Sequence, residues 1–243
     1  MVKFFRRIRL KMLENGRLKN YLLYAFGEII LVVLGILIAL EINNWNEDRK
    51  NMEKEELILR EILHSLAQDS INMEKYIQRI DTSTKASKIL LTLPEYNDSL
   101  INDFVNSIAS VVIVPTNAAF EQLKSTGMDI VKNDSLRQLI VTYYDVTSKN
   151  VQEKLRTNLG EYNTKVMLPF YYENFKFVSS DTTFSDLKFI PKSYSKLIKN
   201  PDYYTTLVFK YIYNEQERIG LIKLRDDIYK LMAAVREELE IRE

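Results

Sequence analysis

The sequence contains no cysteine and a single histidine, His64. Without cysteine the chain has no disulfide, no thiolate metal site and no cysteine nucleophile, which fits a compartment where a free thiol would be a liability. One histidine leaves little basis for a zinc site or a histidine-based catalytic triad. The glycine-rich phosphate loop, the Gly-x-Ser-x-Gly elbow and the His-Glu-x-x-His motif are missing as well. We therefore expect a protein that is not an enzyme and that holds no metal or cofactor.

An excess of charge of one sign is also lacking, because 34 basic and 33 acidic residues leave a net charge of +1. One basic cluster lies within residues 1–20, where Glu14 is the single acid. It consists of Lys3, Arg6, Arg7, Arg9, Lys11, Arg17 and Lys19. Because this cluster adjoins an apolar run, we expect no nucleic-acid partner. We interpret residues 1–20 as a basic cytoplasmic arm, which acts as a topology signal alone or also lies on anionic lipid.

Long hydrophobic runs are rare, and the one that stands out is residues 21–42. Glu28 is the only charged residue between Tyr21 and Leu40. At 1.5 Å per residue the run reaches ~30 Å, the thickness of the hydrocarbon layer of a bilayer. A buried core helix and a cleavable secretory signal are the alternatives, but no small-x-small cleavage site follows the run. We predict an uncleaved transmembrane signal anchor, with the lipid bilayer as its partner.

The charges on either side of this helix predict its orientation. The basic residues before it far outnumber those that follow, and Glu47, Asp48 and Glu53 dilute the latter. The more basic flank stays in the cytoplasm. We therefore expect a single-pass membrane protein, with its N-terminus in the cytoplasm and residues 43–243 translocated across the membrane.

Glu28 raises a chemical question, because an ionised carboxylate in hydrocarbon costs on the order of 2.5 kcal/mol or more. Three interpretations remain open: the side chain reaches the headgroups, it hydrogen-bonds to a partner helix, or it carries protons within a complex. Gly27 and Gly35 fall on nearly the same helix face, where small residues allow a second helix to approach closely. This pattern favours a contact at Gly27, Glu28 and Gly35, through self-association or with another membrane protein.

The remaining sequence predicts a mainly α fold, in which the membrane helix is followed by an exported bundle with long helices. The predicted helices are residues 46–93, 99–108, 118–125, 136–165 and 202–242, capped by Asp98 or Ser99, by Thr116 and Asn117, and by Asn133 to Ser135. The first either continues the membrane helix or hinges at Asn43 and Asn44. Residues 111–114 are the only strand-like run, and we expect an extended linker there. Pro169, the loop at 179–183 and Pro191 predict an irregular middle.

The spacing of apolar residues predicts which helix faces are buried. These positions are Leu57, Ile58, Ile62, Leu66, Met73, Ile77 and Ile80 in the first helix; Leu139, Ile140, Tyr143, Tyr144, Val146, Val151, Leu155, Leu159 and Tyr162 in the second long helix; and Leu207, Tyr211, Asn214, Arg218, Leu221, Arg225, Ile228, Met232, Val235 and Leu239 in the last. The polar residues within the last set argue against a free coiled coil and for packing inside a bundle.

Several short motifs resemble a family of Gram-negative bacterial membrane proteins known only as a domain of unknown function. They are Lys3-Phe-Phe-Arg-Arg-Ile8, Tyr21-Leu-Leu-Tyr-Ala-Phe-Gly-Glu28, Leu40-Glu-Ile-Asn-Asn-Trp-Asn-Glu47, Ala119-Phe-Glu-Gln-Leu-Lys-Ser-Thr-Gly127 and Ile130-Val-Lys-Asn-Asp-Ser-Leu136. The resemblance implies a protein anchored in the bacterial inner membrane, with residues 43–243 forming a helical domain in the periplasm. It brings no activity with it.

Two classes of function follow from these patterns. The first is an anchored helical interaction or scaffold protein of the envelope. The second is a ligand-sensing module, in which a small molecule bound between helices changes their packing and acts through a partner. A proton-coupled membrane subunit that uses Glu28 is a further alternative.

Overall fold

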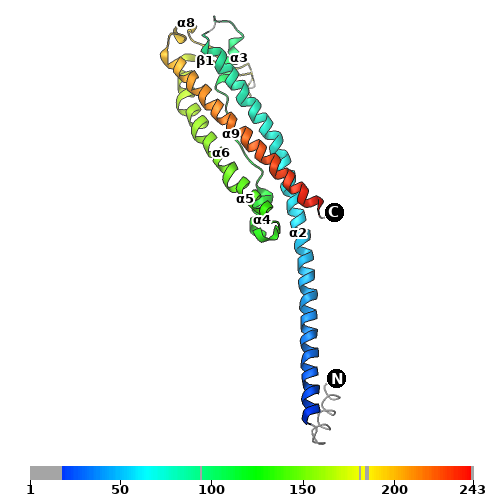
Figure 1. Ribbon diagram of the computed structural model, residues 1–243. Coiled ribbons are helices and arrows are strands. Elements are labelled where there is room, and N and C mark those ends of the chain that lie inside the picture. Colours follow the sequence, from blue (N-terminus) through cyan, green and yellow to red (C-terminus); the bar gives the residue numbers. More distant parts are fainter. Residues whose placement is uncertain (1–17, 94, 181, 184–185, 242–243) are drawn as a thin grey trace. The chain divides into compact units, whose positions relative to one another are not determined.

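The computed structural model describes residues 18–93, 95–180, 182–183 and 186–241 (Figure 1). The chain divides into two compact units, Met1–Lys54 and Glu55–Glu243. Helix α2 (Leu18–Leu91) contributes its residues up to Lys54 to the first unit and the rest to the second. The predicted mainly α fold is confirmed, with one long apolar helix near the N-terminus.

In the first unit, α2 stays helical through Asn43 and Asn44, so the helix continues there without the hinge that was the alternative. No proline occurs before Pro94, and the glycines of this unit are too few to break a helix of this length. The helix ends at Leu91, and Leu93 follows with a left-handed backbone, φ 49°. That conformation cannot continue a right-handed helix.

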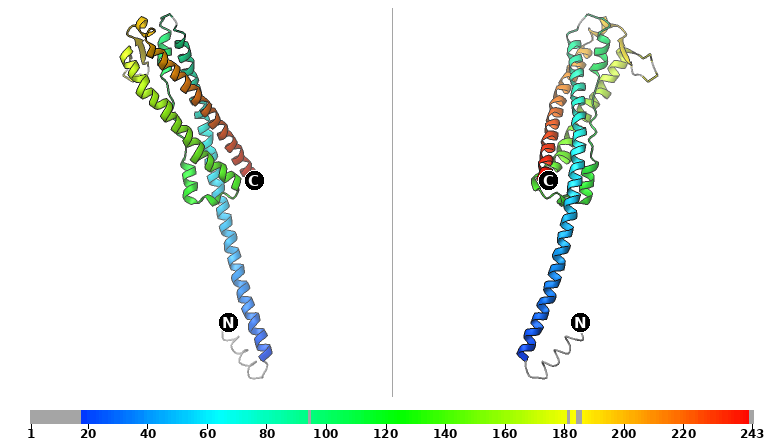
Figure 2. Two further views of the ribbon diagram at one scale, coloured as in Figure 1. Left: turned by 60° about the vertical axis from the view of Figure 1, so that its left-hand side comes forward. Right: turned by 90° about the vertical axis from the view of Figure 1, so that its right-hand side faces the viewer.

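The second unit is a bundle in which the later part of α2 packs with a broken helix, residues 134–174, and with the C-terminal helix α9 (Figures 1 and 2). The elements after α2 are α3 (Leu100–Ser107), α4 (Ala118–Thr126), the 3-10 turn η1 (Met128–Ile130), α5 (Asp134–Val141), η2 (Thr142–Thr147), α6 (Ser148–Lys154), η3 (Leu155–Gly160), η4 (Asn163–Met167), α7 (Leu168–Asn174), β1 (Phe175–Val178), β2 (Lys188–Pro191), α8 (Tyr194–Leu197) and α9 (Pro201–Glu240). The expectation that α9 packs within a bundle is confirmed.

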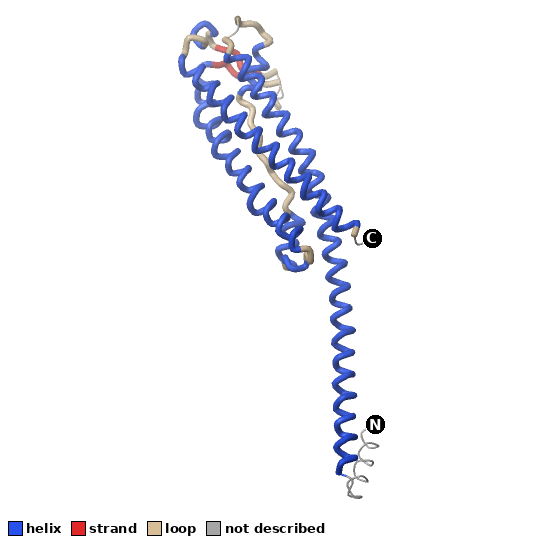
Figure 3. Tube along the Cα trace, in the orientation of Figure 1, coloured by secondary structure: helices blue, strands red, loops and turns tan. Residues whose placement is uncertain are grey.

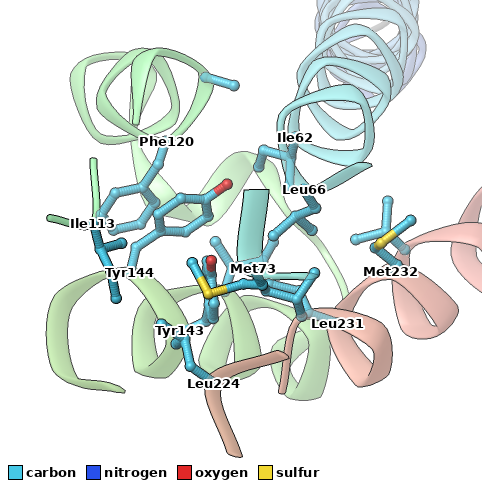
Figure 4. Close-up of a cluster of buried hydrophobic side chains, with 14 of the residues drawn as sticks. Ile62, Leu66, Met73, Ile113, Phe120, Tyr143, Tyr144, Leu224, Leu231 and Met232 are labelled. Atoms are coloured by element: carbon cyan, nitrogen blue, oxygen red, sulfur yellow. The ribbon is translucent and has the colours of Figure 1, made fainter. Parts of the chain in front are cut away.

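The larger of two buried clusters lies between α2, α4, α5 and α9 (Figure 4). Ile62 and Leu66 of α2 and Leu224 and Leu231 of α9 are almost completely buried in it. The ring of Phe120 stacks on that of Tyr144, with centroids 4.6 Å apart. The smaller cluster joins the end of α2 to α3, α7, the strands and the start of α9. The buried hydrophobic side chains of the bundle are therefore divided between two clusters.

The broken helix is longer than the single helix predicted for residues 136–165, and it is not α-helical throughout. It remains helical from Asp134 to Asn174, and η2, η3 and η4 are π-helical segments within it. Pro169 therefore lies inside the helical path, and its placement in an irregular middle is wrong. It occupies the first turn of α7, directly after η4. The helix continues past this proline because the π-helical segment η4 precedes it and changes the regular hydrogen-bond ladder there.

The two short strands were not predicted. β1 and β2 pair antiparallel, with Phe175 opposite Pro191 and Val178 opposite Lys188. Phe175 and Phe189 point into the smaller cluster, so burial of two aromatic rings stabilises strands that are too short to stand alone. Residues 109–117 have no regular structure, which confirms the linker expected around 111–114 (Figure 3).

Some predicted core positions are exposed. Leu57 is 55% exposed, Leu139 46% and Val146 50%. Leu57 lies beside the buried row of α2, since residues 58, 62, 66, 69 and 73 follow one face at spacings of three and four. Val146 lies in η2, where π-helical turns change the rotation between successive side chains, so a pattern counted at 3.6 residues per turn goes out of phase.

Not all of the predicted N-cap residues form a capping hydrogen bond through their side chains. Asn133 accepts a hydrogen bond from the N–H of Leu136 at 3.1 Å, as expected. Ser99 and Asn117 occupy N-cap positions, but their side chains make no capping bond. Thr116 does not cap α4 either, because its hydroxyl donates to Asp69 at 2.9 Å. The preceding linker is thereby attached to α2 rather than to the helix that follows it.

Candidate functional site

The first candidate is the apolar part of α2. Its most apolar 18-residue window has a mean hydropathy of 2.6, and none of that window is buried. Leu31, Leu34 and Leu37 are all more than half exposed. Among the described residues, α2 is the one helix long and apolar enough to cross a membrane. A continuous apolar surface of this kind marks a site of contact with a membrane or another protein.

Gly27, Glu28 and Gly35 all lie in this part of α2. A Cβ atom added at Gly27 or at Gly35 would meet no other atom within 4 Å, so neither glycine is required by packing in the described structure. Glu28 is partly buried and adjoins Ala25, Ile29, Val32 and Val33. The predicted helix contact at these three residues stays a prediction.

The predicted basic arm lies almost wholly outside the described residues. This applies to Lys3, Arg6, Arg7, Arg9, Lys11 and Arg17, whereas Lys19 belongs to the first turn of α2. The role of the arm in topology or lipid contact stays a prediction.

The second candidate is a buried polar network around Lys210, a residue that the sequence patterns did not single out. Lys210 is 0% exposed. Its Nζ donates to the carbonyl oxygen of Ala109 at 2.7 Å and to Oδ1 of Asn163 at 3.0 Å. Nδ2 of Asn163 donates to the carbonyl of Ile108 at 3.0 Å. These bonds satisfy carbonyl groups directly after α3, which the helix itself cannot satisfy.

The network continues to α2. Nδ2 of Asn214 donates to Oγ of Ser83 at 3.0 Å, and that hydroxyl donates to the carbonyl of Ser107 at 3.1 Å. Helices α2 and α9 and the segment after α3 are therefore joined by hydrogen bonds in the interior. Burial lowers the pKa of Lys210 to about 7, because the charged ammonium is poorly solvated there.

Ser107 also holds α7 in place through Tyr171. Their hydroxyl oxygens lie 2.6 Å apart, and the Ser107 hydroxyl is also 2.9 Å from the carbonyl of Phe104. Ser107 can thus donate to Phe104 while it accepts from Tyr171. Burial raises the pKa of Tyr171 above its usual value.

We expect Tyr171→Phe to lower the free energy of unfolding by about 1 kcal/mol, because one buried hydrogen bond is lost without a cavity. Chemical denaturation followed by circular dichroism measures this change. Tyr172→Phe is the matched control, since Tyr172 is 66% exposed, and it should change the free energy by less than about 0.5 kcal/mol. Equal effects of the two substitutions would contradict a stabilising hydrogen bond between Tyr171 and Ser107.

Three of the acidic residues that the structure describes are buried, whereas no sequence pattern separated any acid from surface charge. Glu55, Asp69 and Glu217 are each at most 3% exposed. Glu55 accepts from the N–H of Lys132 at 2.9 Å, and both oxygens of Asp69 accept from the N–H of Thr116 at 3.2 Å. Burial raises the pKa of Asp69, and of Glu217 as well. Glu55 and Asp69 thus fasten connecting segments to α2.

The third candidate is a groove of about 600 Å³ between the broken helix and α9, which we call the α6–α9 groove. Its lining consists of Val146, Thr147, Asn150, Val151, Lys154, Asn158, Gln216, Glu217, Ile219, Gly220 and Lys223. Oε1 of Glu217 accepts from Nδ2 of Asn158 at 3.2 Å, which joins the two sides. The described residues include no group of three or more His, Asp or Glu side chains that could hold a metal.

One signal in the sequence could have identified Lys210 and Glu217. Positions 207, 210, 214, 217 and 221 follow each other at spacings of three and four, and all are buried. Tyr211 and Arg218, which we expected on the buried row, are partly exposed instead. Arg218 forms an ion pair with Asp81 of α2 at 2.5 Å. A sequence pattern that assigns lysine and glutamate to the surface therefore selects the wrong face of α9 as the buried one. Whether these residues are buried depends on their polar partners on other elements.

These features define a mainly helical protein with one helix that could span a membrane and a bundle joined by buried polar contacts. The chain belongs to DUF6090, a family of unknown function, whose model matches residues 28–150. The predicted resemblance to a family of unknown function is thereby confirmed. The match includes most of α2 and continues into α6. No curated protein and no solved structure matches the chain.

Proposed function

We propose that the protein is a membrane-anchored helical scaffold or interaction protein of the bacterial envelope, with a cytoplasmic N-terminus and the bundle in the periplasm. The observation that carries this proposal is the unburied apolar window of α2, with its mean hydropathy of 2.6. Transfer of such side chains into lipid is favourable by about 25 cal/mol per Å². The basic residues that precede this window support the orientation.

The bundle suits a role in presenting a surface. Its long helices are joined by interior hydrogen bonds from Lys210 and Asn214, which favour one arrangement over others. Assembly would then occur through the membrane helix, with itself or with another membrane protein. A proton-coupled subunit that uses Glu28 is a second hypothesis. A ligand-sensing module is the third, and the α6–α9 groove favours it.

Cysteine crosslinking within the membrane tests the scaffold proposal, since the native chain has no cysteine to interfere. Single cysteines would be placed through residues 24–39 of the full-length protein. We expect efficient crosslinks at Leu31 and Ile38, which share the face of Gly27 and Gly35, and weak ones at Ile29 and Val33 on the opposite face.

The same scan in Glu28→Gln and Glu28→Leu backgrounds tests the carboxyl group. We expect Gln to retain the pattern, because an amide can still form a hydrogen bond across the helices, and Leu to weaken it. If crosslinking shows no periodicity, with itself or with a co-purified protein, the helix is a plain anchor and assembly through it is refuted.

A further inference from the structure

The α6–α9 groove has the size of a small-molecule site, since about 600 Å³ lies within the usual range of about 300 to 1,000 Å³. Two π-helical segments contribute to it: Val146 and Thr147 come from η2, and Asn158 comes from η3. Such segments occur frequently at functional sites, because they displace side chains from the regular helical positions. Val146, Val151 and Ile219 supply apolar wall, and Ile219 is 66% exposed.

Gly220 keeps the groove open. It lies in the middle of α9, where glycine costs roughly 0.5–1 kcal/mol relative to alanine. A Cβ atom added at Gly220 would meet no atom within 4 Å, so the packing of the bundle does not require a glycine. A larger side chain at this position would extend into the groove.

The charges of the groove favour an anion. Neither Lys154 nor Lys223 forms an ion pair within 4.0 Å with any residue that the structure describes. A second hollow, lined by Lys149, Glu153 and Arg156, differs in this respect. There Lys149 pairs with Asp145 at 2.6 Å, and Arg156 pairs with Glu153 at 2.6 Å. The unpaired cations therefore distinguish the α6–α9 groove from this second hollow.

Glu217 is the one acid in the lining, and it does not balance the positive charges of both Lys154 and Lys223. It is 3% exposed, and one of its oxygens is engaged by Asn158. Burial is the largest influence on its pKa and raises it, against the smaller effects of Asn158 and Lys154, which lower it. The two cations Lys154 and Lys223 therefore outnumber this single acidic group in the lining.

We propose that the α6–α9 groove binds a small organic acid, whose apolar body lies against Val146, Val151 and Ile219 and whose anionic group lies between Lys154 and Lys223. This site goes beyond the scaffold function and does not depend on it. Asn150 and Gln216 offer further hydrogen bonds to the anionic group. Size, apolar wall and unpaired cations together define a ligand with one apolar end and one negative end.

A protection experiment on the full-length protein in lipid nanodiscs tests the site. A single cysteine replaces Gln216, and its rate of alkylation by a water-soluble maleimide is measured with and without 3-phenylpropanoate. We expect about 10 mM of this probe to slow alkylation about threefold, whereas neutral 3-phenylpropanamide has little effect. Ala233→Cys provides the control cysteine, since Ala233 is exposed on α9 and lies outside the groove.

Two sets of variants then test whether the protection arises from binding in the α6–α9 groove. Lys154→Gln with Lys223→Gln should abolish protection by the carboxylate, because both positive charges of the groove are removed. Gly220→Leu should abolish it by filling the space, and circular dichroism shows whether the helices are retained. Equal protection by the acid and the amide, equal protection at Ala233→Cys, or no protection at any site would overturn the proposal.

Discussion

The free energy of unfolding of the wild-type protein is expected to rise between about pH 7 and pH 9, and replacing Lys210 by methionine is expected to abolish this rise. The folded-state pKa of Lys210 is lowered from 10.5 to about 7. In this window the unfolded chain therefore binds a proton at Lys210 that the folded chain does not bind. Stability then increases with pH, by up to about 1.4 kcal/mol per pH unit, or on the order of 2–3 kcal/mol over the window.

The comparison between wild type and Lys210→Met isolates this effect. At about pH 9 the variant should be the less stable protein, because Ala109 and Asn163 lose a hydrogen-bond donor while no buried charge is relieved. Towards about pH 6 the difference should shrink or reverse, since the wild type then contains a buried ammonium group. Urea denaturation at each pH, followed by circular dichroism, measures the free energy of unfolding of both proteins.

Lys230→Met is the matched control, because Lys230 also lies on α9 but its side chain is 77% exposed. Its substitution should leave the pH dependence unchanged. The window ends near pH 9, because tyrosines of the unfolded chain ionise above it while burial keeps the pKa of Tyr171 and Tyr203 raised in the folded chain. An identical pH slope in wild type and Lys210→Met would contradict the burial of this lysine.

Arginine at two positions of the apolar helix is expected to release the protein from membranes. Leu34 and Leu37 are both more than half exposed within the most apolar part of α2. Each arginine near the centre of a membrane helix costs about 2.5–3.5 kcal/mol, so Leu34→Arg with Leu37→Arg together cost about 5–7 kcal/mol. Fractionation of cells into membrane and soluble material, followed by carbonate extraction, measures the release.

The control adds the same charge elsewhere on the same helix. Gln68→Arg and Gln78→Arg change exposed positions in the part of α2 that belongs to the bundle, and the protein should stay with the membrane. Retention of the Leu34→Arg, Leu37→Arg protein after extraction would show that this segment is not the anchor.

Local patterns were reliable where neighbouring residues alone decide the structure. The capping Asn133 and the long helix α9 were both predicted, because each depends on residues within a few positions. The hairpin of β1 and β2 was missed, since its stability comes from aromatic rings that contact distant helices. Pro169 was misplaced for a related reason, because a preceding π-helical segment allows the helix to continue past it.

The candidate sites also divide into those that local sequence patterns predict and those that they do not. Gly27, Glu28, Gly35 and the basic arm could be named from the sequence, because a membrane helix is defined by length and composition alone. The polar network and the α6–α9 groove could not, since each combines residues far apart in the chain. Lys210 and Ala109, for example, are separated by 101 positions and meet at 2.7 Å.

By itself the sequence determined the apolar helix near the N-terminus, the helical class of the remainder and the order of its long helices. These properties follow from composition and from the spacing of apolar residues, which act over a few turns. Only the tertiary structure decided that Lys210 and Glu217 are buried while Leu57 and Val146 are exposed. The physical reason is that the cost of burying a polar group depends on its partners, and those partners come from distant parts of the chain.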